Sequence, residues 1–83
     1  MKEWKLVFTE EAHDFLVGVR GPRATSVRIA LKSLREHPFD PADAYGRSSD
    51  QRRIEIKFVR DLQVHYWLDF PVREVRIIDI LRR

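Results

Sequence analysis

The chain has 83 residues, a formal net charge of +3 and no cysteine. A chain of this length is expected to form a single domain, residues 1–83, because two halves would each be too small to bury a core. The lack of cysteine excludes disulfide bonds and cysteine-based metal sites or nucleophiles.

The sequence shows no feature of a membrane or exported protein. It contains no run of about eighteen apolar residues, which a membrane-spanning helix needs. Acidic residues interrupt the first fifteen positions, where an export signal requires an apolar core. We therefore expect a cytoplasmic protein that does not contact a membrane.

The positive charge is unevenly distributed. Residues 1–44 contain seven basic and seven acidic side chains, whereas residues 45–83 contain nine basic and six acidic ones. Twelve of the sixteen basic residues are arginine, whose planar guanidinium pairs bidentately with phosphate or carboxylate. This bias favours an anionic partner, either nucleic acid or an acidic protein.

The first half of the chain predicts one strand and two helices. Residues 3–8 alternate in polarity and predict a strand. Thr9 is a suitable N-cap for a short helix over residues 10–19, and Gly21 separates it from a second helix over residues 22–37. The apolar residues that recur at helical spacing in the two helices are Ala12, Phe15, Leu16 and Val19, then Val27, Ala30, Leu31 and Leu34.

The second half predicts a loop and three strands in succession. Two prolines and a glycine mark residues 37–51 as a loop. Strands are expected at 52–59, 61–70 and 73–83, with a tight turn at residues 60–61. The result is an α+β fold of order β-α-α-β-β-β, in which an antiparallel four-stranded sheet carries both N-terminal helices on one face. The other face of the sheet would be open to solvent.

Alternation assigns side chains to the two faces. We place Leu62, Val64, Tyr66 and Leu68 toward the helices and Gln63, His65 and Trp67 on the open face. On the preceding strand we place Ile54, Ile56 and Phe58 inward and Arg53, Glu55 and Lys57 outward. On the last strand Asp79 decides the direction, because a buried carboxylate is costly. Asp79, Leu81 and Arg83 would face outward, and Ile78 and Ile80 inward.

The predicted open face has the side chains that cleave a phosphodiester without a metal. His65 would act as general acid or base, and Glu55 or Asp79 would orient it or act as base. Arg53, Lys57 and Arg83 would stabilise the developing negative charge, and Trp67 would stack on a base. The same residues also fit an ordinary solvated sheet with cross-strand ion pairs.

The remaining histidines indicate no metal site. His13 is expected on the surface of the first helix, and His37 at the end of the second. His13, His37 and His65 lack the spacing of metal ligands, and no glycine-rich phosphate loop occurs. No metal or other cofactor is predicted.

Three segments carry a family resemblance over nearly the whole chain: "WKLVFTEEAHDFL", "SLREHPFDP" and "RRIEIKF…QVHYWLD…EVRIIDILRR". Together they resemble the RelE/ParE superfamily of bacterial toxins. The resemblance implies a small cytoplasmic toxin that a cognate antitoxin neutralises. RelE-like members cut mRNA on the ribosome without a metal, whereas ParE-like members inhibit DNA gyrase.

The resemblance transfers some catalytic positions and not others. Arg53 matches a basic position on the first strand of the meander, and Arg83, or Arg82 if the register slips, matches the arginine of the last strand. Gln63 stands where RelE-type nucleases carry arginine, Glu55 reverses a basic position, and no His or Tyr follows Arg83.

Three outcomes therefore stay open at the level of sequence: a ribosome-dependent mRNA endoribonuclease, a non-enzymatic gyrase inhibitor, and a diverged member without toxicity. The candidate catalytic residues are Arg53, His65, Arg83 and Glu55. The candidate nucleic-acid-binding residues are Lys57, Trp67, Arg82 and Arg47. Expected partners are an antitoxin, presenting an amphipathic helix, and either mRNA on the ribosome or DNA gyrase.

Overall fold

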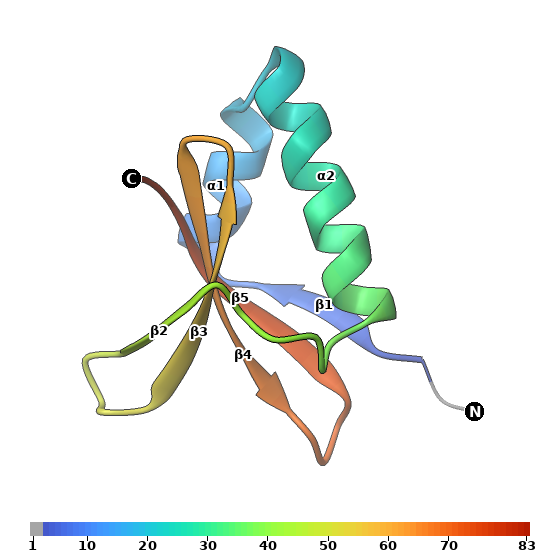
Figure 1. Cartoon of the computed structure of the whole chain (residues 1–83), viewed down its shortest axis with the longest axis vertical. Helices are drawn as coiled ribbons and strands as arrows, with labels where there is room; N and C mark the ends of the chain where they lie inside the picture. Colours follow the sequence, from blue (N-terminus) through green and yellow to red (C-terminus); the bar gives the residue numbers. More distant parts are fainter. Residues whose placement is uncertain (1–2) are drawn as a thin grey trace.

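The computed structural model describes residues 3–83 and contains two helices and one five-stranded sheet (Figure 1). The elements in chain order are β1 (Lys5–Phe8), α1 (Glu10–Gly18), α2 (Gly21–Glu36), β2 (Ala44–Arg47), β3 (Arg53–Val59), β4 (Leu62–Asp69) and β5 (Glu74–Arg82). The strand order across the sheet is β1-β5-β4-β3-β2. The predicted β-α-α-β-β-β arrangement is confirmed.

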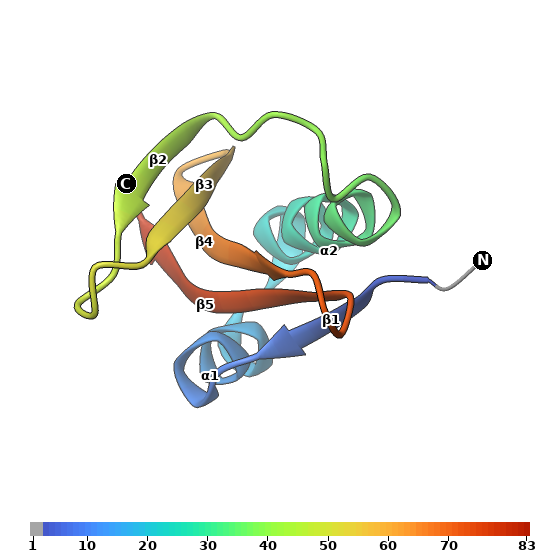
Figure 2. The same ribbon diagram turned by 90° about the horizontal axis from the view of Figure 1, so that it is seen from below.

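The sheet differs from the prediction in two respects. It is mixed, because β1 runs parallel to β5 while the other pairs are antiparallel. It also has a fifth strand, β2, within the predicted loop of residues 37–51. The segment from α2 crosses to the far edge of the sheet, where β2 pairs with β3 (Figure 2). Pairing with an existing strand edge, rather than local propensity, makes this short segment a strand.

Local sequence explains the start of each helix. The Thr9 hydroxyl accepts a hydrogen bond from the Ala12 amide at 3.2 Å and itself donates to the Ile78 carbonyl. It therefore caps α1 and attaches the helix to β5. At the start of α2, Gly21 adopts a positive φ of 65°, which glycine tolerates without strain, and Pro22 occupies the first turn.

Both helices and the sheet share one hydrophobic core. The helices contribute Ala12, Val27, Leu31 and Leu34, and the sheet contributes Val59, Leu62, Val64, Tyr66, Val75, Ile77 and Ile80. The inward direction predicted for β4 is confirmed, because Leu62, Val64 and Tyr66 are fully buried and Leu68 packs against the core.

A β-bulge in β5 resolves the ambiguous last strand. Tyr66 pairs with Ile77 and His65 pairs with Asp79, so Ile78 is an extra residue without a partner on β4. The extra residue shifts the alternation by one. Ile77 and Ile80 can therefore both face the core, while Asp79 stays on the open side as predicted. The prediction that Ile78 enters the core is wrong, because it is only partly buried and lies outside the core cluster.

The faces predicted for β3 are wrong. A two-residue turn, Arg60 and Asp61, places Val59 opposite Leu62, and this register puts Glu55 opposite Tyr66 and Ile56 opposite His65. Paired residues in antiparallel strands share a face. The three inward predictions, Ile54, Ile56 and Phe58, therefore lie on the open face, and the three outward ones, Arg53, Glu55 and Lys57, lie on the helix side. Ile54 is buried as predicted, but outside the core cluster.

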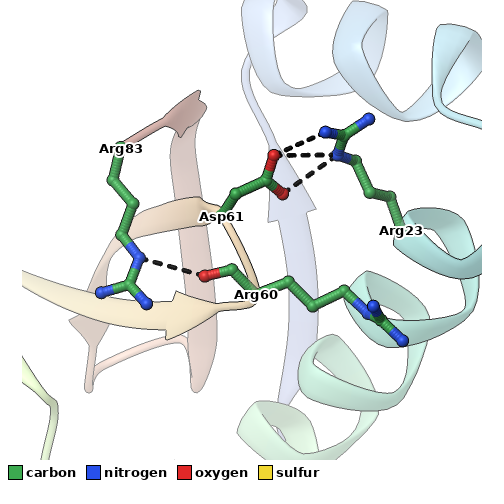
Figure 3. Close-up of polar contacts among 4 residues, drawn as sticks. All are labelled: Arg23, Arg60, Asp61 and Arg83. Carbon is green, nitrogen blue, oxygen red and sulfur yellow. Dashed lines mark hydrogen bonds and ion pairs between the residues drawn. The ribbon is translucent and has the colours of Figure 1, made fainter.

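Polar contacts attach the β3–β4 turn to α2 and to the end of β5 (Figure 3). Arg23 Nε donates to both Asp61 carboxylate oxygens at 3.0 and 3.2 Å, and its Nη2 to one of them at 2.5 Å. Arg60 Nε donates to the Ser26 hydroxyl at 2.6 Å. Arg83 Nε donates to the Arg60 carbonyl at 3.0 Å. The turn that sets the β3–β4 register is thus held from two sides.

Within residues 3–83, neither helix combines the length and the apolar character that crossing a membrane requires.

The buried hydroxyl of Tyr66 makes no hydrogen bond to any described residue. Burial and the neighbouring carboxylate of Glu55 raise the pKa of this phenol. Because an unpaired buried polar group costs stability, Tyr66→Phe is expected to leave the free energy of unfolding unchanged or to increase it by about 1 kcal/mol. Urea denaturation measures this change, with Leu62→Ala as a control that lowers stability by about 2–5 kcal/mol. A clear loss of stability in Tyr66→Phe would show that the hydroxyl has a partner.

The Arg23–Asp61 pair predicts a dependence of stability on pH. Hydrogen bonding to Arg23 lowers the pKa of Asp61 from 3.8 to about 2. A carboxyl with a lowered folded-state pKa stabilises the fold above its ordinary pKa, and this contribution disappears as pH falls to the lowered value. Asp61→Asn should therefore be less stable than the original chain at pH values above about 4, with the difference vanishing near pH 2. Urea denaturation over this pH range tests it, and a difference independent of pH contradicts it.

Candidate functional site on the open sheet face

The face of the sheet opposite the helices, here called the open face, is built mainly from alternate residues of β3, β4 and β5. The register assigns to it Ile54, Ile56, Phe58, Gln63, His65, Trp67, Asp69, Glu74, Arg76, Asp79 and Leu81. The positions predicted on the open face for β4, and for Asp79 and Leu81, are therefore correct.

His65 occupies the centre of the open face, opposite Ile56 on one side and Asp79 on the other. Its Nε2 lies 3.0 Å from the Gln63 side-chain oxygen. Asp79 instead accepts a hydrogen bond from the Ile80 amide at 2.9 Å. Among the described residues the His65 ring is thus oriented by a neutral amide, and no carboxylate forms an ion pair with it.

Trp67 is flanked by two arginines. The guanidinium carbon of Arg52 lies 4.0 Å from the centroid of the indole ring, and that of Arg76 lies 5.5 Å away. Arg76 also pairs with Asp69 at 3.0 Å and with Glu74 at 2.7 Å. The indole ring is therefore engaged in cation–π contacts rather than free to stack on a base, and two carboxylates balance the charge of Arg76.

A cleft of about 360 Å³ lies beside Trp67. The β2–β3 loop lines one side of it, with Ser48, Asp50 and Arg52, and residues 7–9 and 77–78 line another. Hydrogen bonds from Ser48 and from the Arg52 amide lower the pKa of Asp50, so the loop carries an ionised carboxylate at neutral pH. The cleft therefore has both signs of charge at its rim.

Arg83 lies at one end of the open face. Its guanidinium carbon is 4.4 Å from the centroid of the Phe58 ring. Arg82 pairs with Leu62 and so belongs to the helix side of the sheet, although its side chain is exposed. Of the predicted catalytic set, the structure brings only His65 and Arg83 onto the open face.

The other predicted site residues lie on the helix side, around the edge strand β2. Arg53 stacks on Tyr45 with its guanidinium carbon 4.3 Å from the ring centroid, and Lys57 lies 4.0 Å from Asp43. Arg47 pairs with Arg53 across the β2–β3 ladder and donates to the Gln51 carbonyl at 2.9 Å. The predicted cluster of these residues with His65 is thus not formed, because the sheet separates them.

Glu55 is half-buried between Tyr45 and Tyr66 in the same cross-strand row. Burial raises the pKa of its carboxyl, and the nearby Arg53 only partly opposes this effect. A carboxyl with a shifted pKa is a common feature of functional sites, but the position of Glu55 beneath an edge strand explains the shift equally well.

The open face has no excess of positive charge. Arg52, Arg76 and Arg83 are matched in number by Asp69, Glu74 and Asp79. Its middle is apolar, with the buried Ile54, the partly buried Ile56, and Phe58 and Leu81, which are 38% and 43% exposed. Balanced charge around exposed apolar side chains is the composition of a protein-binding surface rather than a phosphate-binding one.

Four contributors to this surface were missed from the sequence. Ile54, Ile56 and Phe58 were assigned to the core, although the two-residue turn at Arg60 and Asp61 was itself recognised. Pairing Val59 with Leu62 across that turn would have placed Phe58 outward. Arg52 carried no signal beyond its charge, because its contact with Trp67 depends on the path of the β2–β3 loop.

The two other histidines lie outside this face. His13 is exposed on α1, with Nδ1 4.0 Å from Asp14, and the backbone N–H of His37 donates a hydrogen bond to the Ser33 carbonyl at the end of α2. Across residues 3–83, no group of three or more histidine, aspartate or glutamate side chains is arranged to hold a metal ion.

Comparison with known proteins gives structural matches only. No protein-family model and no curated protein matches the sequence. Among solved structures, the archaeal RelE–RelB complex from Pyrococcus horikoshii matches with a TM-score of 0.75 at 10% identity, covering 99% of this chain and 97% of that one. The toxin–antitoxin complex RelBE2 from Mycobacterium tuberculosis matches with a TM-score of 0.69 at 21% identity, covering 99% and 100%. The chain therefore has the RelE fold, as its resemblance to the RelE/ParE superfamily predicted.

Proposed function

We propose that this chain is the toxin of a type II toxin–antitoxin system, neutralised by a cognate antitoxin, and that it inhibits growth by binding a cytoplasmic target rather than by cutting RNA. The observation that carries the proposal is the composition of the open face, where apolar side chains and balanced charges stand in place of a cationic site.

The extent of the structural likeness supports the toxin assignment. The match with the RelE–RelB and RelBE2 structures covers nearly the full length of both compared chains. It is therefore a likeness of whole proteins and not of one shared motif. Both matched proteins were solved in complexes with a partner, which supports an antitoxin as the partner here.

The arrangement of charged groups argues against cleavage. Cleaving a phosphodiester without a metal needs an acid–base group together with cations at the phosphate. On the open face His65 contacts Gln63, and Arg76 is neutralised by Asp69 and Glu74. Arg53 and Lys57, the cations expected to complete the site, lie on the other side of the sheet.

The same face is suited to a protein ligand. Phe58 on β3 and Leu81 on β5 both pair with Gln63 on β4, so they lie on either side of Gln63 in one row. Both side chains are substantially exposed. Exposed apolar anchors within a charged rim are typical of sites that bind an amphipathic partner segment. Either the antitoxin or a target such as DNA gyrase would present such a segment.

One observation favours a second candidate, the ribosome-dependent mRNA endoribonuclease. His65 and Arg83 share the open face, so an acid–base group and a cation are present on it. In this reading the ribosome would supply the groups that the chain lacks, and His65 would be indispensable.

Induced expression in bacteria separates the two readings. We expect growth arrest with mRNAs that remain intact in primer extension, and the same arrest with His65→Ala, because no proton transfer is required. The double variant Phe58→Ser/Leu81→Ser should relieve the arrest by removing two exposed apolar anchors. The matched control is Val17→Ser/Ile29→Ser, which removes two even more exposed apolar side chains from the helices.

The outcomes have distinct meanings. Cut mRNAs that disappear with His65→Ala would establish the endoribonuclease instead. No arrest by the original chain would remove the toxin proposal. A gyrase supercoiling assay run in parallel identifies or excludes gyrase as the target.

A further inference from the structure

A group of arginines surrounds the β3–β4 turn, at the end of the molecule where α2 begins and β5 ends. This group, here called the basic end, consists of Arg23, Arg60 and Arg83 around the side-chain carboxylate of Asp61 (Figure 3), together with Arg82, which also acts on the Asp61 charge. The backbone brings them together, since the Arg83 amide donates to the Asp61 carbonyl at 2.9 Å.

Two guanidinium groups of the basic end are held so that their amino groups stay available. Arg60 is anchored through Nε to the Ser26 hydroxyl, and Arg83 through Nε to the Arg60 carbonyl. The Nη groups of both side chains make no hydrogen bond to any residue within 3–83, and both residues are exposed. An anchored guanidinium loses less conformational freedom when it binds an anion, so these two are pre-organised for one.

The basic end accounts for the net charge of the chain. Its four arginines and one aspartate leave three positive charges in excess, and the formal net charge of the whole chain is +3. The other twelve basic and twelve acidic residues cancel. A charge concentrated in this way produces a local positive potential that attracts a polyanion, even though the net charge is small.

The composition of the basic end points to a phosphate backbone. All its cations are arginine, which pairs bidentately with phosphate. The Arg83 guanidinium stacks on one face of Phe58 and so closes that face to a base, and single strands are held largely by base stacking. An acidic protein would require apolar anchors at the centre of the contact, and the members of the basic end supply none.

We propose that the basic end binds the phosphate backbone of a duplex nucleic acid without reading its sequence. The contact uses the amino groups of Arg60 and Arg83, with Arg82 adding charge and the Arg23–Asp61 pair holding the turn in place. Duplex DNA and duplex RNA present the same phosphate chemistry. The proposal does not depend on the toxin assignment, because it concerns binding by the purified chain, although Arg83 also contacts Phe58 of the open face.

The test measures binding of the purified chain to fluorescently labelled duplex DNA and duplex RNA of about 20 base pairs, by anisotropy across a series of salt concentrations. Arg60→Gln/Arg83→Gln removes both anchored cations. Each lost phosphate contact lowers the salt-dependence slope by about 0.9, so the slope should fall by about 2 and affinity at about 0.1 M salt by roughly 10- to 100-fold. The ratio of the two affinities shows whether the site prefers duplex DNA or duplex RNA.

The matched control is Arg28→Gln/Arg35→Gln, which removes the same charge from two exposed positions on α2. It should change duplex affinity by less than about threefold, because nonspecific attraction at a distance is screened by salt. Thermal unfolding of both double variants confirms that they are folded.

Three results would overturn the proposal. One is an equal loss of affinity in the control variant, which would make the binding a property of total charge. Another is polyglutamate binding as tightly as the duplexes, which would identify an acidic protein as the ligand. The third is tighter binding to single-stranded oligouridine than to duplex. Because these measurements use purified chain, their failure is distinct from a failure to arrest growth.

Discussion

The pairing of Val59 with Leu62 across the two-residue turn determines which side chains reach each face of the sheet. Leu62 belongs to the core with the rest of the inward face of β4, so Val59 must be inward as well. Every second residue of β3 before Val59 then lies on the helix side, which includes Glu55 and Lys57. The apolar residues between them are forced onto the open face. A single contact at the turn therefore sets the character of a surface at some distance from it.

The turn is itself held by charged groups rather than by packing alone. Asp61 pairs with Arg23 from α2, and Arg60 reaches Ser26 on the same helix. These contacts connect the centre of the sheet to the helical layer at one end of the molecule. The arginines that stabilise the turn also concentrate positive charge there. The same arginines thus stabilise the turn and supply the positive charge that would attract an anionic ligand.

The open face and the basic end divide the surface chemistry of the molecule. On the open face, carboxylates balance the arginines and isoleucine and phenylalanine fill the middle. At the basic end, one carboxylate faces four arginines. Both surfaces lie outside the hydrophobic core, which is consistent with function residing in surface sites rather than in the fold. A charge-balanced face favours contact with protein, and an unbalanced end favours contact with phosphate.

Much of the fold followed from the sequence because its signals are local. The apolar stripe of α2, the Thr9 cap and the alternation along β4 each depend on residues near one another in the chain. The candidate site was only partly predictable. His65 and Trp67 were placed correctly from alternation. In β3, apolar and charged residues alternate, and hydrophobicity alone predicted that the apolar positions face the helices, whereas the charged positions do. The strand β2 has little propensity of its own and forms because β3 offers an unpaired edge.

Periodicity and capping depend on neighbouring residues, so the sequence was enough to predict the order of every element except β2, the two amphipathic helices and the inward face of β4. The faces of β3, the bulge at Ile78 and the contacts of Arg52 and Arg60 became known only from the folded structure. These depend on strand register and on loop path, which bring together residues that no local pattern relates. Side chains alternate between the two faces of a strand with a period of two residues, so a shift of one residue in the register exchanges the two faces completely.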